Sequence, residues 1–145
     1  MSFLFKKICI SSDHAGYNLK EAIKHHLINK HVSIFDLGPY DSKSVDYPDY
    51  AKKLAKRVRS NKSDIGILVC GSGTGMAISA NKIKGIRAAV CYNSKSTRLS
   101  RQHNNANIIA LGARLINKNL SIKLIELFLK TKFEGGRHLK RIKKI

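Results

Sequence analysis

Residues 65–75 read Ile-Gly-Ile-Leu-Val-Cys-Gly-Ser-Gly-Thr-Gly, and this stretch decides the fold. Its first half is short, apolar and free of charge, which is typical of a strand that is covered on both faces of a sheet. Its second half alternates glycines directly after that strand and can open a helix at about Thr74. A strand, a glycine-rich turn and a helix in direct succession indicate an α/β protein with a parallel sheet.

The same alternation continues on both sides of this stretch. Apolar residues that share one helical face predict three helices, around residues 19–27, 51–58 and 120–128. Short apolar runs predict four more strands, at residues 8–10, 32–35, 88–91 and 108–111. We therefore expect a three-layer α/β/α sandwich around a Rossmann-like, five-stranded parallel sheet, built as a single domain over residues 1–145.

The chain is strongly basic. It has 28 Lys or Arg against 9 Asp or Glu, a formal net charge of +19. Such a charge favours contact with phosphates, but the lysines are scattered, and the only dense basic cluster is the C-terminal segment at about residues 134–145. A solvated basic surface without a partner is the favoured interpretation, with at most weak, non-specific binding of nucleic acid. A nucleic-acid-binding protein on this scaffold remains a less favoured alternative.

The sequence also bears on the compartment. No apolar run is unbroken enough to span a bilayer, and the N-terminus fits neither a secretory signal nor a transit peptide. The three cysteines, Cys9, Cys70 and Cys91, form no CxxC pair, so neither a disulfide framework nor a zinc knuckle is predicted. We expect a cytoplasmic protein without a membrane partner.

Two loops are expected to meet in a crevice. In a doubly wound sheet the first and third strands end side by side, and ligands bind outside their carboxyl ends. The loops there are residues 12–16 and 70–75. Glycines at 71, 73 and 75 let backbone N–H groups converge on an anion. Met76 stands where a Walker A loop needs Lys, and the glycine spacing does not fit a dinucleotide fingerprint.

Individual side chains in or near these loops are candidates for chemistry. Cys70 lies where the N–H groups favour a thiolate, so it is a candidate base, with a buried structural cysteine as the alternative. His14 follows Asp13 at the crevice. His103 ends a further helix that we expect between the strands at residues 88–91 and 108–111, and a helix-end cation is the alternative for it. Arg137 and Arg141 are four residues apart and can form a phosphate fork, or else a solvated tail.

Several segments together carry a resemblance that runs in order over nearly the whole chain. They are Asp13-His14-Ala15-Gly16, Asp46-Tyr47-Pro48, residues 70–75, Ala80-Asn81-Lys82, Gly85-Ile86-Arg87, Ser100-Arg101-Gln102-His103-Asn104 and Glu134-Gly135-Gly136-Arg137-His138. This set resembles ribose-5-phosphate isomerase of type B, in the sugar-phosphate isomerase family that also holds galactose-6-phosphate and allose-6-phosphate isomerases.

The resemblance implies an aldose–ketose isomerase that interconverts D-ribose 5-phosphate and D-ribulose 5-phosphate through a cis-enediolate, without metal or cofactor. It also implies a place in the non-oxidative pentose phosphate pathway. An isomerase of a six-carbon sugar phosphate, allose or galactose 6-phosphate, stays open as the alternative. The implied assembly is a homodimer with a shared active site, or a dimer of dimers, in which His103 comes from the other subunit.

The resemblance further implies a role for each matching residue. Cys70 would be the base, and His103 would open the furanose ring by proton transfer. Asp13 and Ser72 complete the implied catalytic set, and no residue is expected to bind metal. The implied substrate-binding residues are Asp13, His14, Tyr47, Gly71, Ser72, Gly73, Thr74, Gly75, Asn104, Arg114, Arg137 and Arg141.

Overall fold

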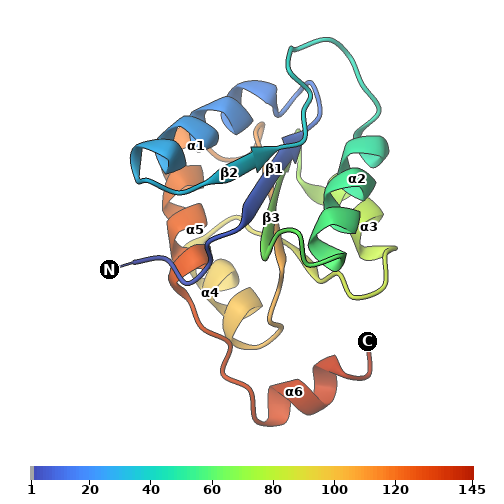
Figure 1. Cartoon of the computed structure of the whole chain (residues 1–145), viewed down its shortest axis with the longest axis vertical. Helices are drawn as coiled ribbons and strands as arrows, with labels where there is room; N and C mark the ends of the chain where they lie inside the picture. Colours follow the sequence, from blue (N-terminus) through green and yellow to red (C-terminus); the bar gives the residue numbers. More distant parts are fainter. Residues whose placement is uncertain (1) are drawn as a thin grey trace.

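The computed structural model of this chain describes residues 2–145 and contains one parallel five-stranded sheet with the strand order β2-β1-β3-β5-β4 (Figure 1). The strands are β1 (Ile8–Ser12), β2 (Ile34–Asp36), β3 (Ile65–Cys70), β4 (Ala88–Val90) and β5 (Ile108–Gly112). The predicted fold class is therefore confirmed. Several boundaries differ from the prediction by one or two residues: β1 ends at Ser12, β2 runs from Ile34 to Asp36, β4 ends at Val90 and β5 ends at Gly112.

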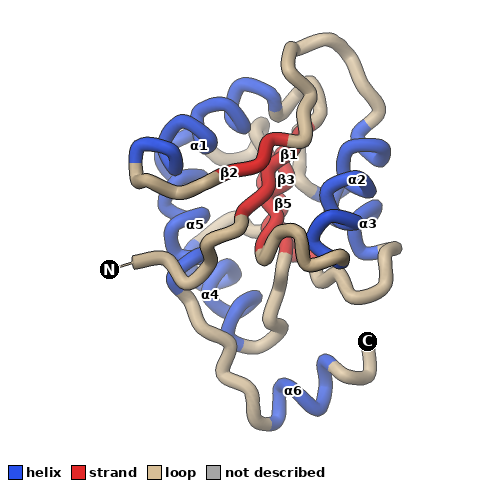
Figure 2. Tube along the Cα trace, viewed as in Figure 1, coloured by secondary structure: helices blue, strands red, loops and turns tan. Residues whose placement is uncertain are grey.

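Helices cover both faces of this sheet, as the three-layer prediction requires. They are α1 (Tyr17–Asn29), α2 (Tyr47–Arg59), α3 (Thr74–Asn81), α4 (Ser94–Gln102), α5 (Lys118–Lys130) and α6 (Arg137–Ile142). In Figure 2 the strands run between α1, α4 and α5 on one side and α2 and α3 on the other. The last helix, α6, lies apart from both layers, below α4 in the same view. Within residues 2–145, no helix is long and apolar enough to cross a membrane.

The strands separate two apolar clusters because side chains alternate between the faces of a sheet. On β3, Ile67 packs into the cluster under α1 and α5, where Phe128 is fully buried. Its neighbour Leu68 packs into the cluster under α2 and α3 with Leu54. Burying each of these side chains stabilises the fold by about 2 kcal/mol. The core thus holds β3 between two layers.

The strand order brings three loops together at the carboxyl edge of the sheet. β1 pairs with β2 on one side and β3 on the other, which is the predicted switch point. β5 lies between β3 and β4, so the loop after β5 also reaches this edge. There the N–H of Ala113 donates to Cys70 O at 2.8 Å, and that of Arg114 donates to Gly71 O at 3.0 Å.

A buried lysine ties α1 to the loop between β2 and α2. The fully buried Lys20 places Nζ 2.9 Å from Asp36 Oδ1 and 2.7 Å from Pro39 O. Lys24, which is partly exposed, lies 2.7 Å from the other carboxylate oxygen. Burial alone would raise the pKa of Asp36, but hydrogen bonds from Lys24, Lys20 and the N–H of Gly38 outweigh it and lower that pKa overall. The ionised carboxylate therefore stabilises the folded chain.

We expect Lys20→Met to lower the free energy of unfolding at pH 7 by about 2–4 kcal/mol, because it removes one partner of a buried ion pair. The matched variant Lys24→Met removes a more exposed partner of the same carboxylate and should cost under about 1 kcal/mol. Urea unfolding at equal protein concentration measures both. Because the pKa of Asp36 is lowered by folding, the stabilisation is present above the unfolded value and is lost as pH falls through the folded one. Equal costs for the two variants would contradict this assignment.

Candidate active site

The thiol of Cys70 lies at the end of β3, at the mouth of the glycine-rich turn. Its Sγ accepts a hydrogen bond from the N–H of Gly73 at 3.1 Å, and the residue is 5% exposed. Gly73 has φ of +80°, a conformation that side-chain-bearing residues rarely adopt, and a Cβ there would lie 3.0 Å from the backbone of Leu111. Since α3 begins at Thr74, the positive end of its helix dipole also lies at this turn.

Two side chains from other elements form the walls of this turn. The ring of Tyr47 lies against Gly75, where an added Cβ would be 2.6 Å from a ring carbon. The guanidinium of Arg114 lies over Gly71, with Nη1 3.1 Å from the position of such a Cβ. Ser72 holds the turn from within, because its Oγ accepts the N–H of Thr74 at 3.2 Å. The glycines are therefore needed for close approach as well as for their N–H groups.

The loop after β1 forms the remaining side. The N–H of Asp13 donates to Val69 O at 3.1 Å, which holds it beside the end of β3. Its buried carboxylate accepts the N–H of Gly16 at 2.9 Å. His14 is exposed, and its Nδ1 lies 3.2 Å from the N–H of Val45. This bond assigns Nδ1 as acceptor, so a neutral His14 carries its proton on Nε2 and can donate it to an anion.

The other predicted site residues lie at the opposite edge of the sheet. His103 follows α4 directly, and a cavity of about 420 Å³ is lined by His103, Asn104 and Arg141. Cys70 pairs with Gly112, which is the last residue of β5, whereas His103 comes before Ile108, the first residue of that strand. The length of β5 alone separates the two ends of the sheet, and thus Cys70 from the His103 side, by about 13 Å. In Figure 1, α6 lies at the bottom, away from the arrowhead of β1.

The structure therefore divides the predicted site residues into two groups. We call the set at the carboxyl edge the cysteine group; it comprises Asp13, His14, Tyr47, Cys70, Gly71, Ser72, Gly73, Thr74, Gly75 and Arg114. We call the set at the amino edge the histidine group; it comprises His103, Asn104, Arg137 and Arg141. Within one chain these two groups do not meet.

Two residues of the segment 134–138 to which the sequence assigned no individual role, Glu134 and His138, lie beside the histidine group. His138 stacks on His103 with ring centroids 4.1 Å apart and planes 12° from parallel. Glu134 Oε1 lies 3.6 Å from Nε2 of both rings. Desolvation, followed by repulsion from His103 and Arg137, lowers the pKa of His138. The four-residue spacing of Glu134 and His138 was the available signal.

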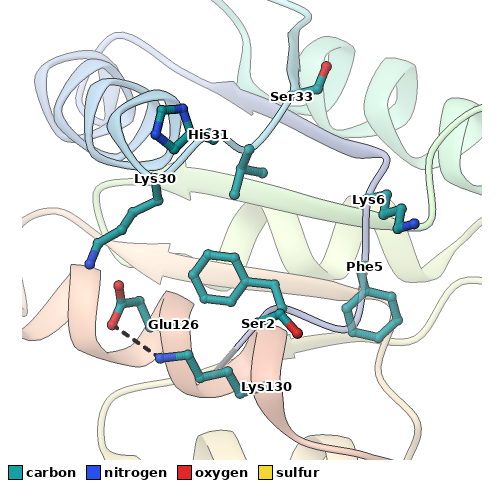
Figure 3. Close-up of a pocket in the computed structure, with 10 residues that line it drawn as sticks. Ser2, Phe5, Lys6, Lys30, His31, Ser33, Glu126 and Lys130 are labelled. Carbon is teal, nitrogen blue, oxygen red and sulfur yellow. Dashed lines mark ion pairs between the residues drawn. The ribbon is translucent and has the colours of Figure 1, made fainter.

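A cavity of about 590 Å³ elsewhere does not belong to this site. It lies where residues 2–6 and the turn before β2 meet α5, and Phe5, Lys30, Glu126 and Lys130 line it (Figure 3). Its lining includes no residue of the cysteine group or the histidine group. The glycine turn at Cys70 is the better candidate because a nucleophilic side chain accepts the N–H of Gly73 there, directly before the start of a helix.

The chain is similar over nearly its whole length to proteins of one family. A model of the ribose/galactose isomerase family matches residues 8–145. A relative from Mycoplasma genitalium, named probable ribose-5-phosphate isomerase B, is 46% identical over 147 residues, which cover 100% of this chain and 95% of that protein. The structure of a ribose 5-phosphate isomerase from Thermotoga maritima is 51% identical, with a TM-score of 0.94 over 95% of both chains. The Mycoplasma genitalium enzyme solved with bound ribulose-5-phosphate is 46% identical, with a TM-score of 0.90 over 94% of this chain and 91% of that one.

The three thiols should differ in reactivity. Burial raises the pKa of Cys9 to about 11 and also raises the pKa of Cys91, and both residues are 0% exposed. Iodoacetamide at neutral pH should therefore alkylate Cys70 more than about tenfold faster than either. Mass spectrometry of the digested chain over time measures the rates, and the unfolded chain, where all three should react alike, is the control. Equal rates in the folded protein would contradict the environment assigned to Cys70.

Proposed function

This chain belongs to the ribose/galactose isomerase family, and we propose that it interconverts D-ribose 5-phosphate and D-ribulose 5-phosphate. One observation carries the proposal: the Cys70 thiol accepts the N–H of Gly73 at 3.1 Å, directly before a helix. A base beside convergent N–H groups is what proton abstraction next to a carbonyl requires. The bound ribulose-5-phosphate in the Mycoplasma genitalium enzyme supports the substrate class. We treat residues 1–145 as one sugar-phosphate isomerase domain.

The first chemical step opens the sugar ring, because an aldose phosphate is mostly cyclic. His103 gives a proton to the ring oxygen as the bond from that oxygen to C1 breaks. The hydroxyl on C1 loses its proton to solvent water, which returns one to His103, and the C1 aldehyde forms. This step is general acid–base chemistry of the kind that an imidazole performs near neutral pH.

The second step moves the carbonyl from C1 to C2. The Cys70 thiolate takes the C2 proton, and the electron pair of that C–H bond passes through C2–C1 onto O1, giving a cis-enediolate. N–H groups of residues 71–75 stabilise the negative oxygen. One proton moves from O2 to O1, both held by Asp13 and Ser72, while Cys70 returns its proton to C1. The aldose has become the ketose without an external oxidant, metal or cofactor.

We further propose that the site is completed by a second copy of the chain. The cysteine group and the histidine group lie at opposite edges of one sheet, with about 13 Å of strand between their levels. A two-fold homodimer supplies His103 and Asn104 of one copy to Cys70 of the other, twice. The phosphate is then held by His14 and Arg114 of one copy and by Arg137 and Arg141 of the other. A dimer of dimers is compatible with this arrangement.

The remaining parts of the proposal concern substrate range and setting. A six-carbon sugar phosphate, allose or galactose 6-phosphate, is the alternative substrate for the same chemistry. Reaction in the non-oxidative pentose phosphate pathway of the cytoplasm follows from the proposed substrate. The net charge of +19 adds at most weak, salt-sensitive contact with nucleic acid.

Turnover of ribose 5-phosphate tests the proposal directly. Cys70→Ala should lower kcat by about 100-fold or more, because it deletes the base. Cys70→Ser should be almost as poor, since a hydroxyl is a much weaker base at neutral pH. Cys91→Ala, which removes a thiol outside both groups, is the matched control and should keep its activity. The readout is the rate of ketose formation, with circular dichroism reporting the fold.

The outcomes separate the alternatives. If Cys70→Ala keeps more than a tenth of the wild-type kcat, Cys70 is not the base. A higher kcat/KM for allose 6-phosphate or galactose 6-phosphate than for ribose 5-phosphate would show that the six-carbon sugar phosphate is the preferred substrate. If the wild-type chain turns over none of these sugar phosphates but binds nucleic acid tightly at about 0.15 M salt, the chain is a nucleic-acid-binding protein and not an isomerase.

Mixed dimers test the shared site. A Cys70→Ala chain paired with a His103→Ala chain has one site with both lesions and one intact site. Purified through two different tags, such heterodimers should recover about half of the wild-type activity from two inactive parents. Heterodimers of Cys70→Ala with Cys70→Ser are the control and should stay inactive. A confirmed Cys70→Ala and His103→Ala heterodimer without activity would refute the shared site.

A further inference from the structure

Three metal-ligating side chains converge at the amino edge of the sheet. The ligand atoms of His103, Glu134 and His138 all lie within 4.8 Å of one another. Each imidazole Nε2 is 3.6 Å from the same oxygen, Glu134 Oε1. Two imidazoles and one carboxylate are a ligand set that suits Zn²⁺ and the neighbouring divalent transition metals.

The backbone holds this cluster in place. The N–H of Glu134 donates to Gln102 O at 3.0 Å, which ties the segment before α6 to the end of α4. His138 is the second residue of α6, and its side chain is only 11% exposed. His103 follows α4 directly, and its side chain is 39% exposed. Three separate points of the chain thus bring their side chains to one spot.

We propose that His103, Glu134 and His138 form a binding site for a divalent transition-metal ion such as Zn²⁺, and that the bound ion inhibits the isomerase by occupying the imidazole of His103. The inhibitory part rests on the proposed function, in which that imidazole transfers a proton during ring opening. The ion is a reversible inhibitor here and takes no part in the chemistry.

The distances are close to those of an occupied site. Zinc binds imidazole nitrogen and carboxylate oxygen at about 2.0–2.2 Å, so two donors on a tetrahedral ion lie about 3.3 Å apart. The observed 3.6 Å between each Nε2 and Glu134 Oε1 needs only a small contraction. The rings are 12° from parallel, so one must turn to aim its lone pair at a shared ion. His103 is the more exposed of the two and has the room to turn.

Charge sets the strength and selectivity of the site. Glu134 supplies one negative charge to a bound cation. The nearby cations Arg137 and Arg141, which also repel a positive charge on His138, oppose its binding. Three ligands in these surroundings should bind zinc reversibly and more weakly than a closed four-ligand structural site does. Mg²⁺ and Ca²⁺ prefer oxygen ligands and should not compete.

Direct titration with Zn²⁺, without substrate, tests the site itself. Isothermal calorimetry on the full chain should give one ion per chain. Glu134→Gln and His138→Asn should each weaken the affinity at least tenfold, and MgCl₂ in excess should change nothing. His25→Asn, which removes an exposed histidine elsewhere, should bind zinc like the wild type. Cys70→Ala should also bind normally, and the Co²⁺ complex of the wild type should show no thiolate charge-transfer band.

Inhibition is measured separately. Zn²⁺ should inhibit wild-type turnover of ribose 5-phosphate over the concentration range in which it binds, and EDTA should restore the rate. His138→Asn should need at least tenfold more zinc for the same inhibition, whereas His25→Asn should respond like the wild type.

The outcomes distinguish this inference from the proposed function. Unchanged zinc affinity in Glu134→Gln and His138→Asn, or loss of binding in Cys70→Ala, overturns the metal site. Binding at these residues with undiminished turnover overturns the inhibition. An inactive wild-type chain overturns the proposed function, while the calorimetric result still decides the site.

Discussion

β3 is hydrogen-bonded to β1 on one side and to β5 on the other, and both of its faces are buried. A strand held in this way cannot slip by one residue without turning its whole apolar set to the wrong layer. Its end is therefore fixed, and so is the turn that follows. Gly73 completes the constraint, because its φ of +80° turns the chain back so that its N–H reaches the Cys70 sulfur. The geometry of the thiol depends on this pairing.

Much of this arrangement follows from the sequence. The central strands are continuous apolar runs, and the glycine-rich turn predicts the helix start that is observed at Thr74. The ends of the edge strands β2 and β4 are harder to predict from the sequence. Val32 was predicted to begin the second strand, but its N–H donates to Leu27 O at the end of α1, so it is part of the helix-end turn. The backbone N–H of Cys91 still donates to Ala110 O at 3.1 Å, so the observed end of β4 differs from the predicted end by only one residue.

The candidate site could be predicted only in part. Parallel strands imply that the loops after β1 and β3 meet, and also that a helix entering β5 ends at the other edge, so the separation of Cys70 from His103 follows from topology. The position of β5 between β3 and β4, which brings Arg114 to Gly71, had no signal in local patterns. Glu134 and His138 approach His103 through a return of the chain after α5, and only the folded structure reveals that contact.

The separation of the two groups across one sheet has a thermodynamic consequence. In the shared site proposed above, a sugar phosphate that contacts both groups contacts two chains, so its binding free energy is also free energy of association. By linkage, substrate tightens the subunit contact by the same factor by which association tightens substrate binding. With such a site, specific activity should fall with dilution below the dissociation constant of the pair, and saturating substrate should reverse the fall. The amount of protein present would then control the rate, which a site built within one folded chain does not allow.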